Sequence, residues 1–205
     1  LKYLLVPLDI HNSCSVHIYV KILNEMGHRV TVLCEMPNYP LGKYFPGYKR
    51  KWVEIERISS NLTIIRSLTW ANNRKTAFKK LGHYLIFMLS GFLNGLKIKN
   101  YDLIIISSPP LFVGLIGAII TKIRSVCFFL DVRDLWPESV ISLGQVKSKV
   151  FINFGRKLES FIYSTTTGFI FTVPGFKKYF EKHYPSQIKK PIVELINGVS
   201  RPFIE

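Results

Sequence analysis

Short, unbroken hydrophobic runs alternate along the chain with longer stretches in which apolar and polar residues recur at helical spacing. Unbroken runs are typical of strands buried on both faces of a parallel sheet, and the longer stretches fit helices that cover such a sheet. The runs predict strands at 3–8, 30–34, 53–58, 62–66, 102–107, 126–131, 169–173 and 192–196. The longer stretches predict helices from 13 or 15 to 27 and at 73–96, 111–123, 147–163 and 176–184.

The order of these elements predicts an α/β fold with a single Rossmann-like, doubly wound and mostly parallel sheet. Residues 53–58 and 62–66 flank a polar turn and are expected to form a hairpin or two short edge strands. Residues 1–196 contain no repeat or low-complexity tract and are expected to form one domain, and residues 197–205 are expected to begin a linker. Residues 36–47 contain three prolines and two glycines and predict an ordered loop or a mobile flap.

The balance of charge restricts the possible partners. The chain has 28 Lys and Arg against 13 Asp and Glu, a net charge of +15. This excess favours an anionic partner, which would be nucleic acid, an acidic membrane surface or a phosphorylated substrate. The basic residues are spread over many elements, and the sequence has no helix-turn-helix, zinc or RNA-recognition signature. We therefore expect no nucleic-acid partner.

The cysteines and the longest hydrophobic segments bear on the cellular location. Cys14, Cys34 and Cys127 have no metal-ligand spacing, so we interpret them as reduced, structural thiols and expect no metal site. The first apolar run is too short for a signal peptide. As a helix, residues 81–96 would span about 24 Å, less than the roughly 30 Å of a bilayer core. These features predict a cytoplasmic protein.

Ligands of open parallel sheets bind at the carboxyl ends of the strands, so the chemistry is expected in the loops at that edge. Directly after a predicted buried strand, Asp131 and Asp134 flank Arg133 and precede a Trp-Pro pair that is expected to be exposed. This group is either functional or a structural pairing of Arg133 with both aspartates. The first loop, residues 9–17, lacks the GxGxxG motif of a dinucleotide site. It leads into a helix amino terminus that either receives a phosphate or carboxylate or is simply capped.

The flap combines basic and aromatic residues. Lysines and an arginine, at 43, 49, 50 and 51, alternate with rings at 39, 44, 45, 48 and 52. The pattern fits the diphosphate of an acceptor beside rings that stack on sugars or dip into an interface. The alternative is a solvated basic loop around a small aromatic cluster.

The predicted helix at 73–96 also joins cations to rings. It carries Arg74, Lys75, Lys79 and Lys80 together with Phe78, Tyr84, Phe87 and Met88. Two interpretations stay open. The helix lies on an acidic membrane surface, or it is a core helix with a basic solvated end.

Two motifs give the chain a resemblance to a known family. Residues 131–139, DVRDLWPES, resemble the Asp-x-x-Asp-Leu-Trp-Pro-Glu-Ser stretch of bacterial retaining glycosyltransferases of family 4, a group of cell-surface polysaccharide enzymes that includes fucosamine-transferase-like proteins. Residues 37–43, PNYPLGK, resemble the Pro-Asn-Tyr-Pro-x-Gly-Lys flap of that group. Residues 27–33 and 196–199 also fit their expected places. The resemblance spans nearly the whole chain, and two of its motifs are specific.

The resemblance implies the amino-terminal, acceptor-side half of a GT-B fold, in which two Rossmann-like domains face each other across a cleft. In that fold the second domain grips the nucleotide sugar and carries an acidic Glu-x7-Glu motif, and nothing in this sequence resembles it. The chain is accordingly expected to be a truncation, a natural fragment or one subunit of a split enzyme, and to be inactive alone. The missing domain, supplied in cis or in trans, would be its partner.

The reaction implied by the resemblance is sugar transfer with retention at the anomeric carbon, as in capsule or O-antigen synthesis. A nucleotide diphosphate sugar would be the donor substrate, a lipid-linked sugar would be the acceptor, and no cofactor is expected. The enzyme would be peripheral on the inner face of the cytoplasmic membrane, with an anionic membrane surface as a further partner. The alternative is a non-catalytic membrane- or partner-binding subunit of a split glycosyltransferase.

The family's functional positions transfer to this sequence as three groups. The catalytic candidates are Asp131, Arg133 and Asp134. The residues expected to contact the donor are Asn12, Ser13, Ser15 and His17. The residues expected to bind the acceptor are Asn38, Tyr39, Lys43, Lys49, Trp136 and Glu138. Two departures concern the donor sugar: Arg133 stands where many members have His, and Cys14 stands among serines where many have glycines.

Overall fold

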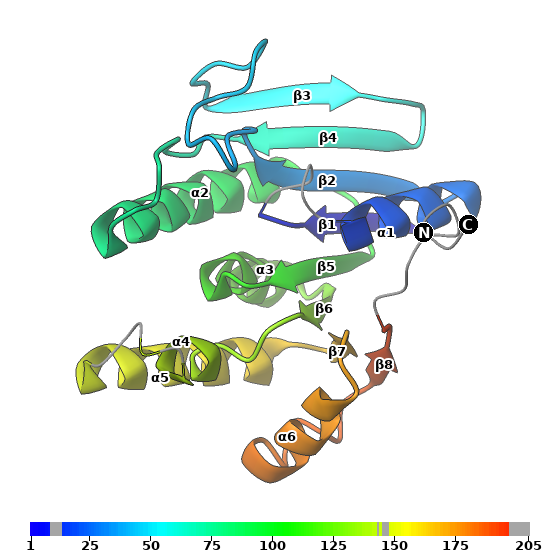
Figure 1. The fold of residues 1–205 in the computed structure, drawn as a ribbon. Helices are drawn as coiled ribbons and strands as arrows, with labels where there is room; N and C mark the ends of the chain where they lie inside the picture. Colours follow the sequence, from blue (N-terminus) through cyan, green and yellow to red (C-terminus); the bar gives the residue numbers. More distant parts are fainter. Residues whose placement is uncertain (9–13, 143, 145–147, 197–205) are drawn as a thin grey trace, which may run out of the picture.

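A computed structural model of the protein describes residues 1–8, 14–142, 144 and 148–196, apart from the side chains of residues 14, 15, 77 and 140. Its strands are β1 (Lys2–Val6), β2 (Arg29–Glu35), β3 (Val53–Arg57), β4 (Leu62–Ser67), β5 (Leu103–Ser108), β6 (Cys127–Val132), β7 (Gly168–Phe171) and β8 (Ile192–Glu194). They form one sheet in the order β3-β4-β2-β1-β5-β6-β7-β8 (Figure 1). Neighbouring strands are parallel, except that β3 and β4 are antiparallel.

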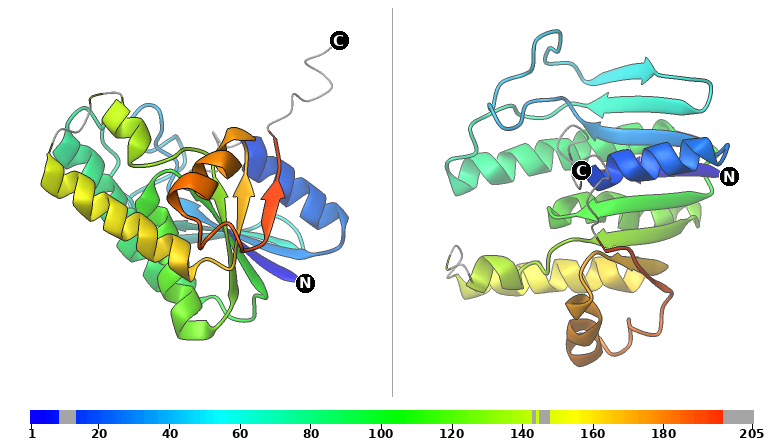
Figure 2. Two further views of the ribbon diagram at one scale, coloured as in Figure 1. Left: turned by 90° about the horizontal axis from the view of Figure 1, so that it is seen from below. Right: turned by 45° about the vertical axis from the view of Figure 1, so that its right-hand side comes forward.

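The helices cover the two faces of this sheet unequally. They are α1 (Cys14–Glu25), α2 (Ala77–Lys97), α3 (Leu111–Arg124), α4 (Glu138–Ser142), α5 (Lys149–Thr165) and α6 (Gly175–His183). Helix α1 lies on one face, and α2, α3 and α5 lie side by side on the other (Figure 2). Parallel crossovers are right-handed, and the chain moves one way along the sheet from β1 to β2 and the other way from β4 to β5. The two crossover helices therefore fall on opposite faces.

The larger core lies between the sheet and the face that carries α2, α3 and α5. Phe87, Ile104, Ile116 and Phe128 are fully buried there. At Gly117 of α3, an added Cβ would lie 2.4 Å from a methyl carbon of Ile106, so the helix can approach β5 this closely only with glycine. A smaller core under α1 joins β1, β2 and β4.

The predicted fold class agrees with the structure, and several boundaries differ. Residues 53–58 and 62–66 form the hairpin β3–β4, which is the first of the two predicted alternatives. The helix predicted from 73 begins at Ala77 instead, because side chains of Asn72 and Asn73 bind nearby backbone N–H groups and Thr76 caps the helix. The short helix α4 falls in a segment predicted as a loop. Residues 197–205, predicted to begin a linker, lie outside the described residues.

The strands at the two edges of the sheet are short or polar. Strand β3 forms one edge and carries Glu54, Glu56 and Arg57, while β8 at the other edge is three residues long. Two cysteines are described with their side chains: Cys34 is buried in β2, and Cys127 is exposed at the start of β6. Across the described residues, no helix is both long and apolar enough to span a bilayer.

Candidate functional site

Two groups of polar side chains lie where parallel strands end, one on each face of the sheet. We call them the Asp131 cluster (Tyr19, Ser107, Asp131 and Arg133) and the Glu35 cluster (Glu35, Asn38, Thr69, Arg74 and His83). The first was partly predicted from the sequence, and the second was not. The basic flap, residues 36–51, lies beside the Glu35 cluster.

The Asp131 cluster is built around a carboxylate that is fully buried at the end of β6. The hydroxyl of Ser107, on the neighbouring strand β5, donates a hydrogen bond of 2.8 Å to Asp131 Oδ2. Arg133 places Nε 2.9 Å and Nη2 2.8 Å from the same oxygen, while Oδ1 accepts no hydrogen bond from the described residues. Burial raises the pKa of Asp131, and Arg133 and Ser107 oppose that shift.

Tyr19 of α1 completes this cluster from above the sheet. Burial, with a smaller contribution from the charge of Asp131, raises the pKa of the Tyr19 hydroxyl to about 12, and a hydrogen bond with Arg133 opposes the shift. Arg133 keeps 22% of its side chain exposed, whereas Asp131 has none. Of this ion pair, the arginine is therefore the partner that reaches solvent or a ligand.

The other residues of the 131–139 motif behave differently from the prediction. Asp134 is half-buried, and among the described residues Arg133 forms an ion pair with Asp131 and none with Asp134. Trp136, expected to be exposed, is half-buried instead. Its ring lies on Gly155 of α5, where an added Cβ would be 2.6 Å from the ring, and Glu138 Oε1 lies 3.0 Å from Arg156 Nη2. Both side chains thus fasten the motif to α5.

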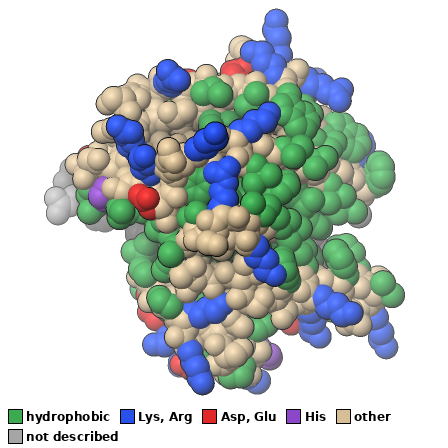
Figure 3. Space-filling model, turned by 180° about the vertical axis from the view of Figure 1, so that it is seen from behind, with side chains coloured by type: hydrophobic (Ala, Val, Ile, Leu, Met, Phe, Trp, Pro, Cys, Tyr) green, Lys and Arg blue, Asp and Glu red, His purple; other side chains and the backbone are tan. Residues whose placement is uncertain are grey.

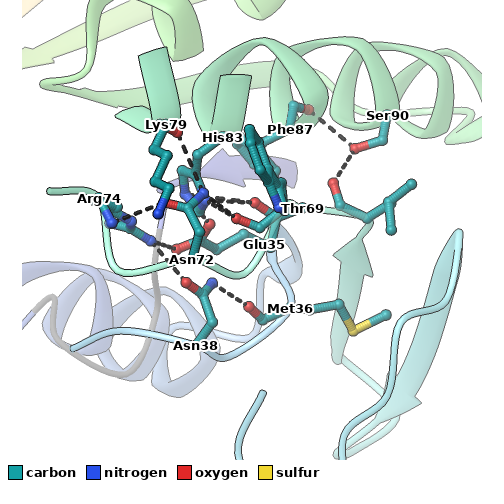
Figure 4. Close-up of polar contacts among 12 residues, drawn as sticks. Glu35, Met36, Asn38, Thr69, Asn72, Arg74, Lys79, His83, Phe87 and Ser90 are labelled. Atoms are coloured by element: carbon teal, nitrogen blue, oxygen red, sulfur yellow. Dashed lines mark hydrogen bonds and ion pairs between the residues drawn. The ribbon is translucent and has the colours of Figure 1, made fainter. Parts of the chain in front are cut away.

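The Glu35 cluster joins three segments on the opposite face (Figure 4). Glu35 ends β2, and its side chain is fully buried. Arg74 Nη2 lies 3.0 Å from Oε1, and His83 Nε2 of α2 lies 2.7 Å from Oε2. His83 Nδ1 lies 2.9 Å from the Trp70 carbonyl oxygen, which can only accept, so Nδ1 carries a proton.

This cluster also fixes the flap. Arg74 Nη2 donates a second hydrogen bond to Asn38 Oδ1 over 3.0 Å, and Asn38 Nδ2 donates to the Met36 carbonyl over 2.8 Å. The Arg74 guanidinium lies 5.3 Å from the centre of the Tyr39 ring. On its other side, the Glu35 backbone N–H donates to the carbonyl of Leu8, which immediately precedes the first loop. Glu35 therefore connects the flap, α2 and the start of that loop.

Specific contacts hold the flap in place. Of the two predicted alternatives, an ordered loop or a mobile flap, it is therefore the ordered loop. The Tyr44 hydroxyl donates a hydrogen bond of 2.6 Å to the Thr69 carbonyl oxygen. Gly42 has φ +67° and lies so close to Asn72 that a Cβ would be 2.5 Å from the Asn72 carbonyl oxygen. Of the predicted acceptor residues in the flap, Asn38 is buried, while Tyr39, Lys43 and Lys49 are exposed.

The donor-contacting prediction falls largely outside the described structure. Asn12 and Ser13, and the side chain of Ser15, are not among the described residues. His17 lies in the first turn of α1 and is exposed. Within the described ranges, no three His, Cys, Asp or Glu side chains come together as a metal site requires.

Sequence reasoning missed Glu35 and His83 and read Arg74 as part of a basic surface. A signal was present, because Glu35 directly follows a buried apolar run and His83 precedes the buried Phe87 by one helical turn. The membrane interpretation of this helix named Tyr84, Phe87 and Met88, but Phe87 is fully buried and the other two are half-buried. Phe78, in contrast, is 74% exposed.

Comparison with known proteins places the fold. No protein-family model matches the sequence, and no curated protein matches it. Among solved structures, the chain is similar to a sucrose-phosphate synthase from Thermosynechococcus elongatus, with a TM-score of 0.57 and 14% sequence identity over 100% of this chain and 93% of that one. A likeness at this identity concerns the fold alone. It confirms the predicted α/β, Rossmann-like sheet of the type found in the amino-terminal half of a GT-B fold.

Proposed function

We propose that this chain is the acceptor-side part of a retaining glycosyltransferase that moves a sugar from a nucleotide diphosphate sugar to a lipid-linked acceptor. The observation that supports it best is that two features lie at the same carboxyl edge of a GT-B-like sheet: an arginine anchored by a buried carboxylate, and a basic, aromatic flap. That edge is where open α/β sheets bind their ligands.

In this proposal, Arg133 faces the donor and Asp131 acts through it. The leaving diphosphate develops negative charge, which a fixed guanidinium stabilises more than a flexible cation does. Asp131 holds Arg133 Nε and Nη2 and has no exposed surface, so it is a positioning residue. Asp134 follows at the strand end and is proposed to orient an acceptor hydroxyl.

The acceptor is proposed to lie on the flap. Tyr39 is 46% exposed and offers a ring face to a sugar, and Lys43 and Lys49 are exposed cations suited to a diphosphate. The Glu35 cluster fixes the flap that presents these groups. A second domain, in the same polypeptide or in another, would bind the nucleotide, so the isolated chain is expected to transfer no sugar.

A membrane surface is the proposed setting, and its contact area differs from the one predicted. On the face that carries α2, Leu81, Leu85, Leu89 and Leu93 recur every four residues and are 36–54% exposed. Hydrophobic side chains form a broad patch on this face, with Lys and Arg side chains beside it (Figure 3). Each cation near an anionic leaflet contributes about 1 kcal/mol, so a few cations with inserted apolar side chains suffice for reversible attachment.

Acceptor kinetics test the proposed function. The enzyme, assembled from this chain and a donor-binding domain, is compared with a Lys43→Ala, Lys49→Ala double variant. Loss of two phosphate contacts is expected to raise the KM for the acceptor about tenfold and to change kcat little. The matched control is Lys97→Ala with Lys99→Ala, two exposed cations at the other end of α2. Equal kinetic effects of the two pairs, or turnover by the isolated chain, would contradict the proposal.

Sedimentation with phosphatidylglycerol vesicles tests the membrane part. Attachment is expected at low salt and release at high salt, and it should weaken when Leu81 and Leu85 are replaced by Ser or when Lys75, Lys79 and Lys80 are neutralised. Arg74, first grouped with these cations, is left unchanged because it pairs with buried Glu35. Equal binding to neutral vesicles, or no change in either variant, would show that this face is ordinary protein surface.

A further inference from the structure

A cavity of about 560 Å³ lies between the flap, the β4–α2 connection and α2. Rings and branched side chains form most of its wall: Tyr44, Trp52, Leu68, Trp70, Ile86 and Leu89. Binding sites for small molecules commonly have volumes of about 300–1,000 Å³ and predominantly apolar walls. The cavity therefore has the size and the lining of a ligand site.

The walls of this cavity are fixed by specific contacts. Trp70 lies on Gly82 of α2, where a Cβ would be 2.8 Å from the ring, and its ring meets Phe78 edge-on. Tyr44 is held by its hydrogen bond to the Thr69 carbonyl, and the Leu68 backbone N–H donates to the Trp52 carbonyl over 3.0 Å. Tyr44 and Trp52 are thus tied to the β4–α2 connection, and Trp70 packs on α2, so the space between them is part of the fold.

The cavity is continuous with the leucine row of α2. Leu89 lines the cavity and is also 54% exposed as a member of that row. Trp52 and Trp70 are 43% and 36% exposed at the same place. An apolar chain leaving a bilayer at the α2 face would thus pass from the leucine row into the cavity without crossing polar surface.

The charge of Arg50 indicates which kind of lipid head group the cavity suits. It is the one charged side chain among the described residues that line the cavity. A guanidinium at an apolar cavity suits a single chain joined directly to a phosphate. A glycerophospholipid instead has two chains, and its glycerol ester region separates them from the phosphate.

We propose that this cavity binds the phosphate-proximal part of an isoprenyl diphosphate, with the chain between Trp52 and Trp70 and the diphosphate on Arg50. The inference rests on the proposed function, because it assigns the lipid carrier of the acceptor to a place. The flap would then bind both ends of the same substrate, with the carrier behind Tyr44 and the sugar beside Tyr39.

Direct binding of farnesyl diphosphate, kept below its micelle concentration, tests this site by calorimetry on the full chain. Ile86→Trp fills the cavity and is expected to weaken binding at least about tenfold. Ile22→Trp is the matched control, because Ile22 is 47% exposed on α1, on the other face of the sheet, and does not line the cavity. Arg50→Ala should weaken binding of the diphosphate about tenfold and leave farnesol binding unchanged, whereas Lys51→Ala, whose lysine pairs with Glu54, should change neither.

Tryptophan fluorescence provides a measurement that needs no cavity-filling variant. A bromine-substituted alkyl diphosphate should quench the wild-type chain through Trp52 and Trp70, and quenching should be lost when both are replaced by Phe and only Trp136 remains. The proposal is overturned if Ile86→Trp and Ile22→Trp bind alike, or if inorganic diphosphate or dihexanoyl phosphatidylglycerol binds as tightly as the probe. Equal quenching of Trp136 would overturn it too. If the chain binds the probe but the assembled enzyme transfers no sugar to the acceptor, this lipid site stands and the proposed transferase function is refuted. If the enzyme transfers sugar but the chain does not bind the probe, the transferase function stands and this lipid site is refuted.

Discussion

The Glu35 and Asp131 clusters both bury a carboxylate at the end of a parallel strand, but they balance its charge differently. Glu35 contacts two nitrogen-bearing side chains, those of Arg74 and His83, which come from a loop and from α2. Asp131 has one, Arg133, which is two residues away in the chain. The Glu35 cluster ties together distant segments, while the Asp131 cluster presents one partly exposed arginine. We infer that the first serves mainly the fold and the second mainly the chemistry.

Glu159 extends the comparison to a buried acid with no cation in contact. It is 1% exposed, and the Tyr184 hydroxyl donates a hydrogen bond to it. Among the described residues it forms no ion pair, and burial raises its pKa to about 7. The three acids therefore form a series among the described residues: Glu35 contacts an arginine and a histidine, Asp131 contacts one arginine, and Glu159 contacts neither. Their replacement should have graded effects on stability.

The largest effect is expected for Glu35→Ala. It leaves the Arg74 and His83 side chains buried without their anion, and breaking such a pair costs about 4 kcal/mol of unfolding free energy. Urea unfolding of the full chain measures this loss. The control is Glu25→Ala, which removes an exposed pair with Lys21 and should cost less than about 1 kcal/mol. Similar losses in the two variants would show that the Glu35 cluster does not hold the fold.

An intermediate effect is expected for Arg133→Ala. Asp131 then keeps its burial and loses its cation, so the variant should lose about 2–3 kcal/mol at pH 8. The loss should shrink as the pH falls, because burial that Arg133 no longer opposes raises the pKa of Asp131 and favours the protonated carboxyl. Adding Asp131→Asn should restore most of the stability. In the assembled enzyme, sugar transfer should stay low in both variants, because the guanidinium is absent from each. Recovery of turnover together with stability would assign the cluster a structural role alone.

The smallest effect, and one of opposite sign, is expected for Glu159→Gln. The folded chain holds a proton on Glu159 up to a pH of about 7, whereas the unfolded chain releases it near 4.5. The unfolded state thus binds fewer protons between these values, so this group lowers stability as the pH rises through that range. The amide should be nearly neutral at pH 4 and stabilising by about 1–2 kcal/mol at pH 8. Thermal unfolding across this range checks the slope, and equal stabilisation at every pH would rule out the titration.

The same contrast explains what the sequence reveals. Asp131 and Arg133 are neighbours in the chain, so a local motif points to their pairing, although the anchoring hydroxyl of Ser107 depends on the register of β5 and β6. Glu35, Arg74 and His83 are far apart in the chain and meet only when α2 crosses the sheet. The sequence left two interpretations of this helix open, a membrane surface and a core position. The turn at Asn72 and Asn73 shifted the start of α2 and drew Arg74 inward.

The positions of the parallel strands could be predicted because such strands are hydrophobic throughout. Short helices could not, because they contain too few residues to show the helical spacing of apolar positions. Helix α4, with five residues, is an example. Trp136 was predicted to be exposed, but Gly155 on α5 provides a flat surface for its ring. That match between a ring and a glycine 19 positions later (155 − 136) depends on how α5 packs, which local sequence does not encode.

The edges of the sheet bear on how the protein behaves at high concentration. An unprotected edge strand is a template on which another chain can add a strand and begin to aggregate. Here β3 meets solvent with Glu54, Glu56 and Arg57 around an Ile55 that is 60% exposed, and β8 offers three residues for pairing. Charge at one edge and brevity at the other keep an eight-stranded sheet from extending into fibrils, so this protein can remain dispersed despite its broad apolar surface.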